Sequence, residues 1–318
     1  MDVRFWGTRG SLPASVTTKH IRQKVHRALE IAVERGLGPD MDIEAFMDQT
    51  LPFWVKGTYG TNTPCIEIRE GRERLICDAG SGIRDLGNHL LRNGKGSPPR
   101  EFHILLSHPH WDHIHGFPFF VPTLIEGTRI TIYGCHDGLK EAFTRQHSAP
   151  FFPLDFHDLR AKIEFVRLET DRAYDIAGFQ VMATAQHHPG KSYGYRIERN
   201  GKAIVYSTDS EHKFEGSIET LSPVSFFKGA DLLIFDAQYT LADAWTVKED
   251  WGHSNNVVGV EFAKEAGVKH LCLFHQEPVS DDEKLDKILA DTRKLASLFE
   301  GDSPLEVTVA WDGLTLKL

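Results

Sequence analysis

The sequence predicts an α/β fold in which two β-sheets pack face to face with helices outside them, and three observations support this. Short β-branched or alternating apolar runs recur along all 318 residues, with turn sequences between them. Helical patterns are fewer and lie between or after the predicted strands. No Pro- or Ser-rich linker and no short repeat divides the chain, so we expect a single domain over residues 1–318.

The predicted strands fall into two groups along the chain. In the first half they are residues 3–6, 66–68, 75–77, 103–107 and 130–133. In the second half they are residues 163–167, 181–185, 193–197, 203–207, 232–235, 271–274 and 307–311. Many short strands with interspersed helices are typical of two packed sheets in one domain.

Helical spacing is present in four segments, namely residues 20–34, 81–92, 255–266 and 282–299. The first of these follows two threonines that can cap it. It also places four apolar residues on one stripe, Ile21, Val25, Leu29 and Ala32.

Residues 14–58 differ from the rest of the chain. They are rich in helical patterns, and their six basic and six acidic side chains cancel. They also separate two polar loop sequences, residues 7–11 and 59–63. We therefore expect an N-terminal helical insertion over approximately residues 14–58, which forms a lid or a dimer contact.

Composition excludes several classes of protein. The 36 Lys and Arg against 45 Asp and Glu give a net charge of −9, which makes a nucleic-acid partner unlikely because phosphate backbones require clustered basic residues. No apolar run approaches the ~20 residues of a membrane helix, and the N-terminus has no signal peptide. The four scattered cysteines are typical of buried thiols in a reducing compartment. We expect a cytoplasmic protein with no membrane partner.

Histidine is unusually abundant, with seventeen residues against fifteen Tyr, Met and Cys combined. A predicted strand, residues 103–107, leads into a loop with His108, His110, Asp112 and His113. Four imidazole or carboxylate groups within six residues can converge on two cations. Because none of these ligands is a thiolate, the set admits zinc, manganese or iron.

Three other predicted strands also end in candidate ligands. Residues 181–185 lead into the pair His187 and His188, residues 203–207 into Asp209, and residues 271–274 into His275. This repeated placement predicts a metal site on one edge of the two sheets. Eight other histidines have no such context, and we expect them at the surface: His20, His26, His89, His136, His147, His157, His212 and His270.

With these motifs the sequence resembles the metallo-β-lactamase fold hydrolases, from Met1 to the last strand. The resemblance implies an αββα four-layer sandwich. It also implies that Asp78, in Cys-Asp-Ala-Gly-Ser-Gly, braces the metal-binding loops. The family pattern assigns His108, His110 and His188 to one metal. It assigns Asp112, His113 and His275 to the other, with Asp209 bridging both. Two divalent ions are implied, with zinc expected and manganese or iron as alternatives.

Two further features resemble the phosphodiesterase branch, which contains tRNA 3′-processing endonucleases and cyclic phosphate phosphodiesterases. The sequence Gly194-Tyr195-Arg196-Ile197 has the branch's spacing after His188, which is why we prefer His188 to His187. Asp236 follows a strand, and His253 stands in a His-Ser pair. In that branch these two residues form a pair beside the phosphate. The plainer interpretation is that Asp236 ends a strand and His253 precedes a helix.

The resemblance implies attack on phosphorus by a hydroxide bridging the metals, with Asp112 holding it and His253, oriented by Asp236, contacting the phosphate or protonating the leaving group. The tRNA endonucleases carry a long arm between the third and fourth motifs, but here His188 and Asp209 are only 21 positions apart. We expect a small or cyclic, nucleotide-like phosphodiester as substrate. The alternatives are a thioester or lactone hydrolase and a nuclease acting on RNA or DNA ends. A homodimer is one expected assembly.

Overall fold

The computed structural model describes residues 1–92, 99–212, 222–240, 250–299 and 304–318. Two seven-stranded sheets lie face to face. The strand order of the first sheet is β14 (Thr315–Lys317), β1 (Asp2–Gly7), β2 (Cys65–Glu70), β3 (Glu73–Cys77), β4 (Glu101–Leu105), β5 (Arg129–Gly134) and β6 (Lys162–Arg167). The order of the second is β13 (Glu306–Val309), β12 (His270–Phe274), β11 (Leu232–Asp236), β10 (Lys202–Ser207), β9 (Ser192–Arg199), β8 (Phe179–Gln186) and β7 (Ala173–Ile176).

Apolar residues from both sheets form the core between them. Phe5 of the first sheet meets Phe274 of the second with ring centroids 6.1 Å apart, and Tyr206 lies against the same Phe274 ring. All three side chains are completely buried. Burial of each such ring stabilises the fold by about 2–3 kcal/mol, so the alternating apolar residues of the strands hold the two sheets together.

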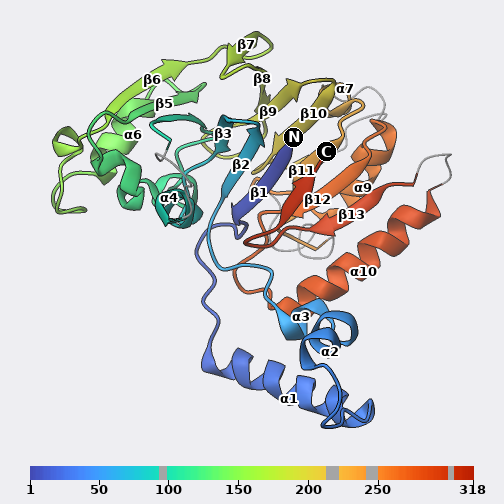
Figure 1. Cartoon of the computed structure of the whole chain (residues 1–318). Helices are drawn as coiled ribbons and strands as arrows, with labels where there is room; N and C mark the ends of the chain where they lie inside the picture. The colour runs from blue at the N-terminus through green and yellow to red at the C-terminus, as the bar shows by residue number, and fades with distance from the viewer. Residues whose placement is uncertain (93–98, 213–221, 241–249, 300–303) are drawn as a thin grey trace.

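Helices cover the outer faces of the sheets, which completes the four-layer αββα arrangement (Figure 1). On the first sheet they include α4 (Gly82–Arg92), the short α5 (Trp111–Ile114) and α6 (Leu139–Gln146). On the second they include α7 (Ser222–Phe227), α9 (Asn256–Glu265) and α10 (Asp282–Leu298). The predicted fold class is confirmed. Each predicted strand overlaps an observed one, whereas β7, β14 and α6 were not predicted.

Strand direction places the ends of several strands at one edge. In the first sheet, β3 to β6 are parallel. In the second, β10 to β13 are parallel, and two antiparallel steps through β9 give β8 the same direction as β10. The carboxyl ends of β4, β8, β10, β11 and β12 therefore meet at one edge of the sandwich, which is where open α/β sheets bind ligands.

Residues 14–58 contain three helices, α1 (Thr18–Glu34), α2 (Ile43–Thr50) and α3 (Phe53–Lys56). The hydroxyl of Thr17 accepts a hydrogen bond from the backbone N–H of His20 and caps α1. Figure 1 shows α1 farthest from the two sheets, with α2 and α3 between it and α10. The status of this segment as an insertion, and of the chain as one domain, stays a prediction.

All four cysteines are free and buried. No helix in the described part of the chain is long and apolar enough to cross a membrane.

Two histidines expected at the surface are buried, and those predictions were wrong. His270 starts β12, and its Nε2 lies 2.8 Å from the hydroxyl of Thr308 on β13. His147 is completely buried against the rings of Phe117 and Phe152. Both lie at the end of an element in an apolar setting. A single histidine next to apolar residues has no sequence pattern that distinguishes it from an exposed one.

Burial gives His147 a pH-dependent effect on stability. It lowers the pKa of the ring from 6.5 to about 4, and neither ring nitrogen has a hydrogen-bond partner. Below pH 6.5 the unfolded chain takes up a proton that the folded protein refuses until about pH 4, so His147 destabilises the protein as the pH falls through this window. Between pH 7 and pH 5 the free energy of unfolding should fall in the wild type because of His147, and the His147→Leu variant lacks this contribution. We therefore expect the fall to be about 1–2 kcal/mol smaller in the variant. Urea denaturation at the two pH values measures this, and an equal loss in both proteins would contradict it.

Candidate metal centre

The candidate ligands lie at the edge where strand ends meet. His108, His110, Asp112 and His113 follow β4, partly on the single turn of α5. His188 follows β8, Asp209 follows β10, and His275 follows β12. The elements that carry these seven residues are far apart in the sequence, and the strand directions bring them together.

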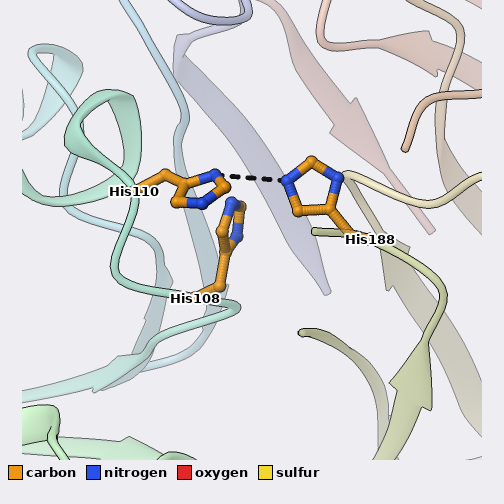
Figure 2. A group of neighbouring side chains, drawn as sticks. All are labelled: His108, His110 and His188. Atoms are coloured by element: carbon orange, nitrogen blue, oxygen red, sulfur yellow. Dashed lines mark hydrogen bonds between the residues drawn. The ribbon is translucent and has the colours of Figure 1, made fainter. Parts of the chain in front are cut away.

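The first group consists of His108, His110 and His188, whose ligand nitrogens lie within 4.8 Å of one another. Figure 2 shows the three rings pointing toward one another, with Nε2 of His188 3.2 Å from Nδ1 of His110. Burial lowers the pKa of all three rings, and repulsion from neighbouring histidines adds to the effect, with His253 as that neighbour for His188. Neutral imidazoles are the form that binds metal. The exposed His187 is not part of this group.

The second group consists of Asp112, His113, Asp209 and His275, also within 4.8 Å of one another. Nε2 of His113 lies 3.1 Å from Asp112 Oδ2 and 3.2 Å from Asp209 Oδ1. Nε2 of His275 has the same two separations, 3.1 and 3.2 Å. All four side chains are at least nine-tenths buried.

Asp209 connects the two groups. Its Oδ2 faces the first group, 3.6 Å from His108 Nε2 and 3.7 Å from His188 Nε2, while its Oδ1 faces the second. The buried Nε2 atoms of His108 and His113 have no hydrogen-bond partner although carboxylate oxygens lie near them. Ring nitrogens and carboxylate oxygens that surround a common point without hydrogen-bonding to one another are arranged as ligands of a cation. The residues present therefore fit two divalent ions bound by N and O atoms.

Asp78 contacts the second group through His113. Its carboxylate accepts hydrogen bonds from the backbone N–H and hydroxyl of Ser107 (both 2.8 Å) and from the Tyr206 hydroxyl (2.6 Å). It also lies 2.7 Å from Nδ1 of His113. Because the carboxylate fixes Nδ1 as the protonated nitrogen, Nε2 of His113 is left free to face the site.

The left-handed backbone recurs among these residues. Asp78, Asp209 and His275 have φ angles of +61°, +22° and +61°. Asp78 and His275 directly follow β3 and β12, and Asp209 lies two residues after the end of β10, so the sharp change in direction turns each side chain across the edge of the sheet. Backbone of this kind is costly for residues other than glycine, and it is often found at functional sites.

The loop before His253 orients His188. The backbone carbonyl of Gly252 lies 2.8 Å from His188 Nδ1, so it accepts the ring proton and leaves Nε2 toward the first group. The Gly252 N–H donates to Glu211 at 3.2 Å. A side chain at position 252, where φ is +84°, would come within 2.4 Å of the His188 ring. Sequence reasoning missed this glycine, although its position directly before His253 was a usable signal.

Asp236 and His253 form a pair beside both groups. His253 Nδ1 lies 2.9 Å from Asp236 Oδ2 and 3.9 Å from Asp209 Oδ2. Burial lowers the pKa of His253, but the charge and hydrogen bond of Asp236 outweigh burial and raise it to about 9. The imidazole is therefore protonated at neutral pH and able to donate a proton from this position.

Two contacts at the second group were not predicted. The Gln238 side-chain oxygen lies 2.9 Å from His275 Nδ1, and so fixes the tautomer of that ring. The backbone N–H of Ser11 donates to Asp112 Oδ2 at 2.8 Å. Gln238 follows Asp236 by two residues, which was a usable signal, but no local pattern pairs residue 11 with residue 112.

Comparison with known proteins shows which family has this fold and sequence pattern. A family model described as a beta-lactamase superfamily domain matches residues 73–276. Ribonuclease Z of Archaeoglobus fulgidus is 24% identical over 277 residues, covering 69% of this chain and 85% of that protein. Ribonuclease Z of Brevibacillus brevis is 34% identical over 99 residues, but the match covers only 30% of this chain and 29% of that protein.

Solved structures share the fold along the whole chain. The metallo-beta-lactamase fold protein YhfI from Bacillus subtilis has a TM-score of 0.64 at 18% identity, covering 99% of this chain and 98% of that one. A diphosphatase of the PhnP family has a TM-score of 0.61 at 16% identity, covering 100% and 97%. The short form of human tRNase Z has a TM-score of 0.59 at 19% identity, and the match covers 100% of this chain and 99% of that one. The family match contains β4, β8, β10, β11 and β12, whose ends carry the site, and the chain belongs to the beta-lactamase superfamily.

Proposed function

We propose that this protein is a dinuclear metal-dependent phosphodiesterase that cleaves a small or cyclic, nucleotide-like phosphodiester. The observation that carries the proposal is the Asp236–His253 pair beside the two ligand groups, because it supplies a buried cationic acid where a phosphate would meet the metals. A phosphodiester already carries negative charge on its non-bridging oxygens in the ground state, whereas the carbonyl group of a thioester or lactone is neutral, so a buried cation at this point suits the phosphodiester better.

In this proposal His108, His110 and His188 would hold one ion, Asp112, His113 and His275 would hold the other, and Asp209 would be a ligand of both. Zinc is the proposed metal, and manganese or iron would suit the same ligands. The two ions would lower the pKa of a water molecule and neutralise charge on the phosphate oxygens.

The protein's own residues supply the remaining steps. Asp112 orients the attacking water by accepting a hydrogen bond from it, and the proton that the water loses would pass to solvent. Burial raises the pKa of this carboxyl, but His113 and His275 outweigh burial and hold the pKa well below its usual range, so Asp112 stays ionised for this role. Its Oδ2 is kept in place by the N–H of Ser11. His253, oriented by Asp236, donates its proton to the leaving oxygen.

The size of the substrate is inferred from the interval between His188 and Asp209. Strands β9 and β10 fill this interval as a hairpin, so no arm projects from it. A small phosphodiester needs no such arm, and it can reach the cations without a basic surface, which a chain of net charge −9 is poorly suited to provide.

A nuclease acting on RNA ends is the second candidate, because relatives of this chain carry the name ribonuclease Z. Those relatives do not support the expectation that a nucleic-acid partner is unlikely. A thioester or lactone hydrolase is the third candidate.

One substrate panel separates these three candidates. We expect the zinc-loaded protein to cleave bis(p-nitrophenyl) phosphate and at least one 2′,3′-cyclic, 3′,5′-cyclic or cyclic-dinucleotide substrate, with Asp112→Ala as the blank. We expect His253→Ala to lower kcat about 10²–10⁴-fold while zinc content stays the same, because the acid is lost but no proposed ligand is. His187→Ala is the matched control and should be unaffected. Processing of a tRNA precursor, or thioester cleavage without phosphodiester cleavage, would replace the proposal.

The Asp236–His253 pair predicts a pH dependence. An acid acts only while protonated, so the rate falls as the pH rises through the pKa of His253, near 9. Removing the Asp236 charge lowers that pKa, and we expect Asp236→Asn to move the alkaline limb of the kcat profile to lower pH. Initial rates from pH 6 to 10 measure the limb. An unchanged limb in a variant with full zinc content would show that His253 is not the acid.

The contacts of Asp78 predict an effect on metal affinity. Asp78→Asn removes the charge that makes His113 a stronger ligand, and we expect zinc to bind about 10–100-fold more weakly at the second group. Competition with a chelator of known affinity gives the constant. Asp231→Asn is the control, because Asp231 is a buried carboxylate at the opposite end of β11. Equal zinc affinities for wild type and folded Asp78→Asn would contradict the prediction.

A further inference from the structure

Helices α1 and α2 enclose an apolar groove that faces solvent. Its volume is about 340 Å³, and five side chains line its open part: Ile21, Val25 and Leu29 from α1, with Ile43 and Met47 from α2. The first three are 53%, 54% and 62% exposed. Their spacing of four residues places them in one row on α1. Three of the four residues of the apolar stripe predicted for this helix are therefore exposed to solvent.

An apolar row of this kind normally faces a core. Here residues 14–58 have a small core of their own, formed by Ile31, Phe46, Leu51 and Val55, and the last three of these also form the floor of the groove. The stripe remains exposed next to apolar residues of α2. Contiguous exposed apolar surface is rare on soluble proteins and typically marks an interaction site.

The two helices carry opposite charges. Residues 18–35 contain five Lys or Arg against two Glu, a net charge of +3. Residues 40–50 contain four Asp or Glu and no basic residue, a net charge of −4. Arg22 is seven residues before Leu29 and lies on the same face of α1, while Glu44 is three residues before Met47 on α2. The apolar groove thus has a basic rim at Arg22 on α1 and an acidic rim at Glu44 on α2, while Lys24 and Lys56 line its interior.

A surface with this pattern is complementary to itself. In a two-fold contact the same patch meets itself in reverse, so α1 of each copy faces α2 of the other. The apolar rows then meet, and each basic rim faces an acidic rim. The twelve charges of residues 14–58 cancel, so the net −9 of the chain lies outside them and the contacting segment adds no net repulsion of its own.

The groove is also held firmly on the protein. Nζ of Lys24 donates to the backbone carbonyls of Trp54 and Gly57 and lies 2.7 Å from Asp282 Oδ2 at the start of α10. Asp282 in turn accepts the backbone N–H of Tyr59 at 2.8 Å. A docking surface fixed in advance loses less conformational entropy on binding.

We propose that the groove between α1 and α2 is the contact between two copies of this chain, with α1 of each copy against α2 of the other. This assembly is independent of the proposed reaction, because none of the candidate ligands lies in the groove.

Sedimentation velocity on the full chain, from 1 to 100 µM, tests whether the groove joins two copies. We expect wild type to be a dimer at the upper concentrations and Leu29→Glu to be a monomer with an unchanged circular dichroism spectrum. Leu298→Glu is the matched control, since Leu298 is a similarly exposed leucine on α10, and it should remain a dimer. A wild-type monomer at 100 µM, or a dimer of Leu29→Glu, would overturn the proposal.

Charge reversal tests which helices meet. One variant carries Lys19→Glu and Arg22→Glu on α1, and the other carries Glu44→Lys and Asp48→Lys on α2. Each alone sets like charges against each other in both halves of the contact, so we expect each to be a monomer. Mixed in equal amounts, the two should form a heterodimer in which both halves are again complementary. A mixture that stays monomeric, or single variants that remain dimers, would overturn the pairing of α1 with α2.

Discussion

The arrangement of this site depends on the buried carboxylate of Asp209. Each of its oxygens lies 3.2–3.7 Å from ring nitrogens of two histidines, one oxygen toward each ligand group. Burial alone would raise the pKa of this carboxyl, but the surrounding histidines hold it well below its usual range. A buried anion is tolerated only with compensating positive charge, which here comes from protonated histidines or from bound cations. The geometry therefore fits cations on both sides of Asp209.

The residues around Asp209 come from both sheets, at the carboxyl ends of their parallel strands. His108 and His113 come from the end of β4 in the first sheet, and Asp209 and His275 come from the ends of β10 and β12 in the second. No single sheet edge could surround Asp209 from both sides. Two sheets packed through Phe5 and Phe274 bring their carboxyl edges within ligand distance, so the core between the sheets also determines the spacing of the site.

Much of this arrangement follows from local sequence pattern, and the rest does not. Candidate ligands can be found because each follows an apolar run, and His188 is preferred over His187 by its distance from Gly194. Gly252 and Gln238 act through contacts that only the folded chain creates, so a linear pattern does not reveal them. The prediction that His147 is exposed fails for a related reason, because the rings that enclose it are brought there by the tertiary structure. The apolar stripe of α1 was found, but its exposure depends on how α2 and α3 attach to α10.

Backbone hydrogen bonds near residues 9–14 and 61–62 connect the segment of residues 14–58 to the loops beside the candidate metal site. The two ends of the segment are joined by hydrogen bonds from Ala14 N–H to the carbonyl of Thr61 (2.9 Å) and from Arg9 N–H to the carbonyl of Asn62 (2.8 Å). Ser11, just before this closure, is the residue that donates to Asp112. Backbone hydrogen bonds close the segment at residue 14, and Lys24 of α1, whose Nζ lies 2.7 Å from Asp282 Oδ2 of α10, attaches it at a second point away from the ligand loop. All seven candidate ligands follow this 45-residue segment in the sequence, so we expect changes in its length or shape to have little effect on them.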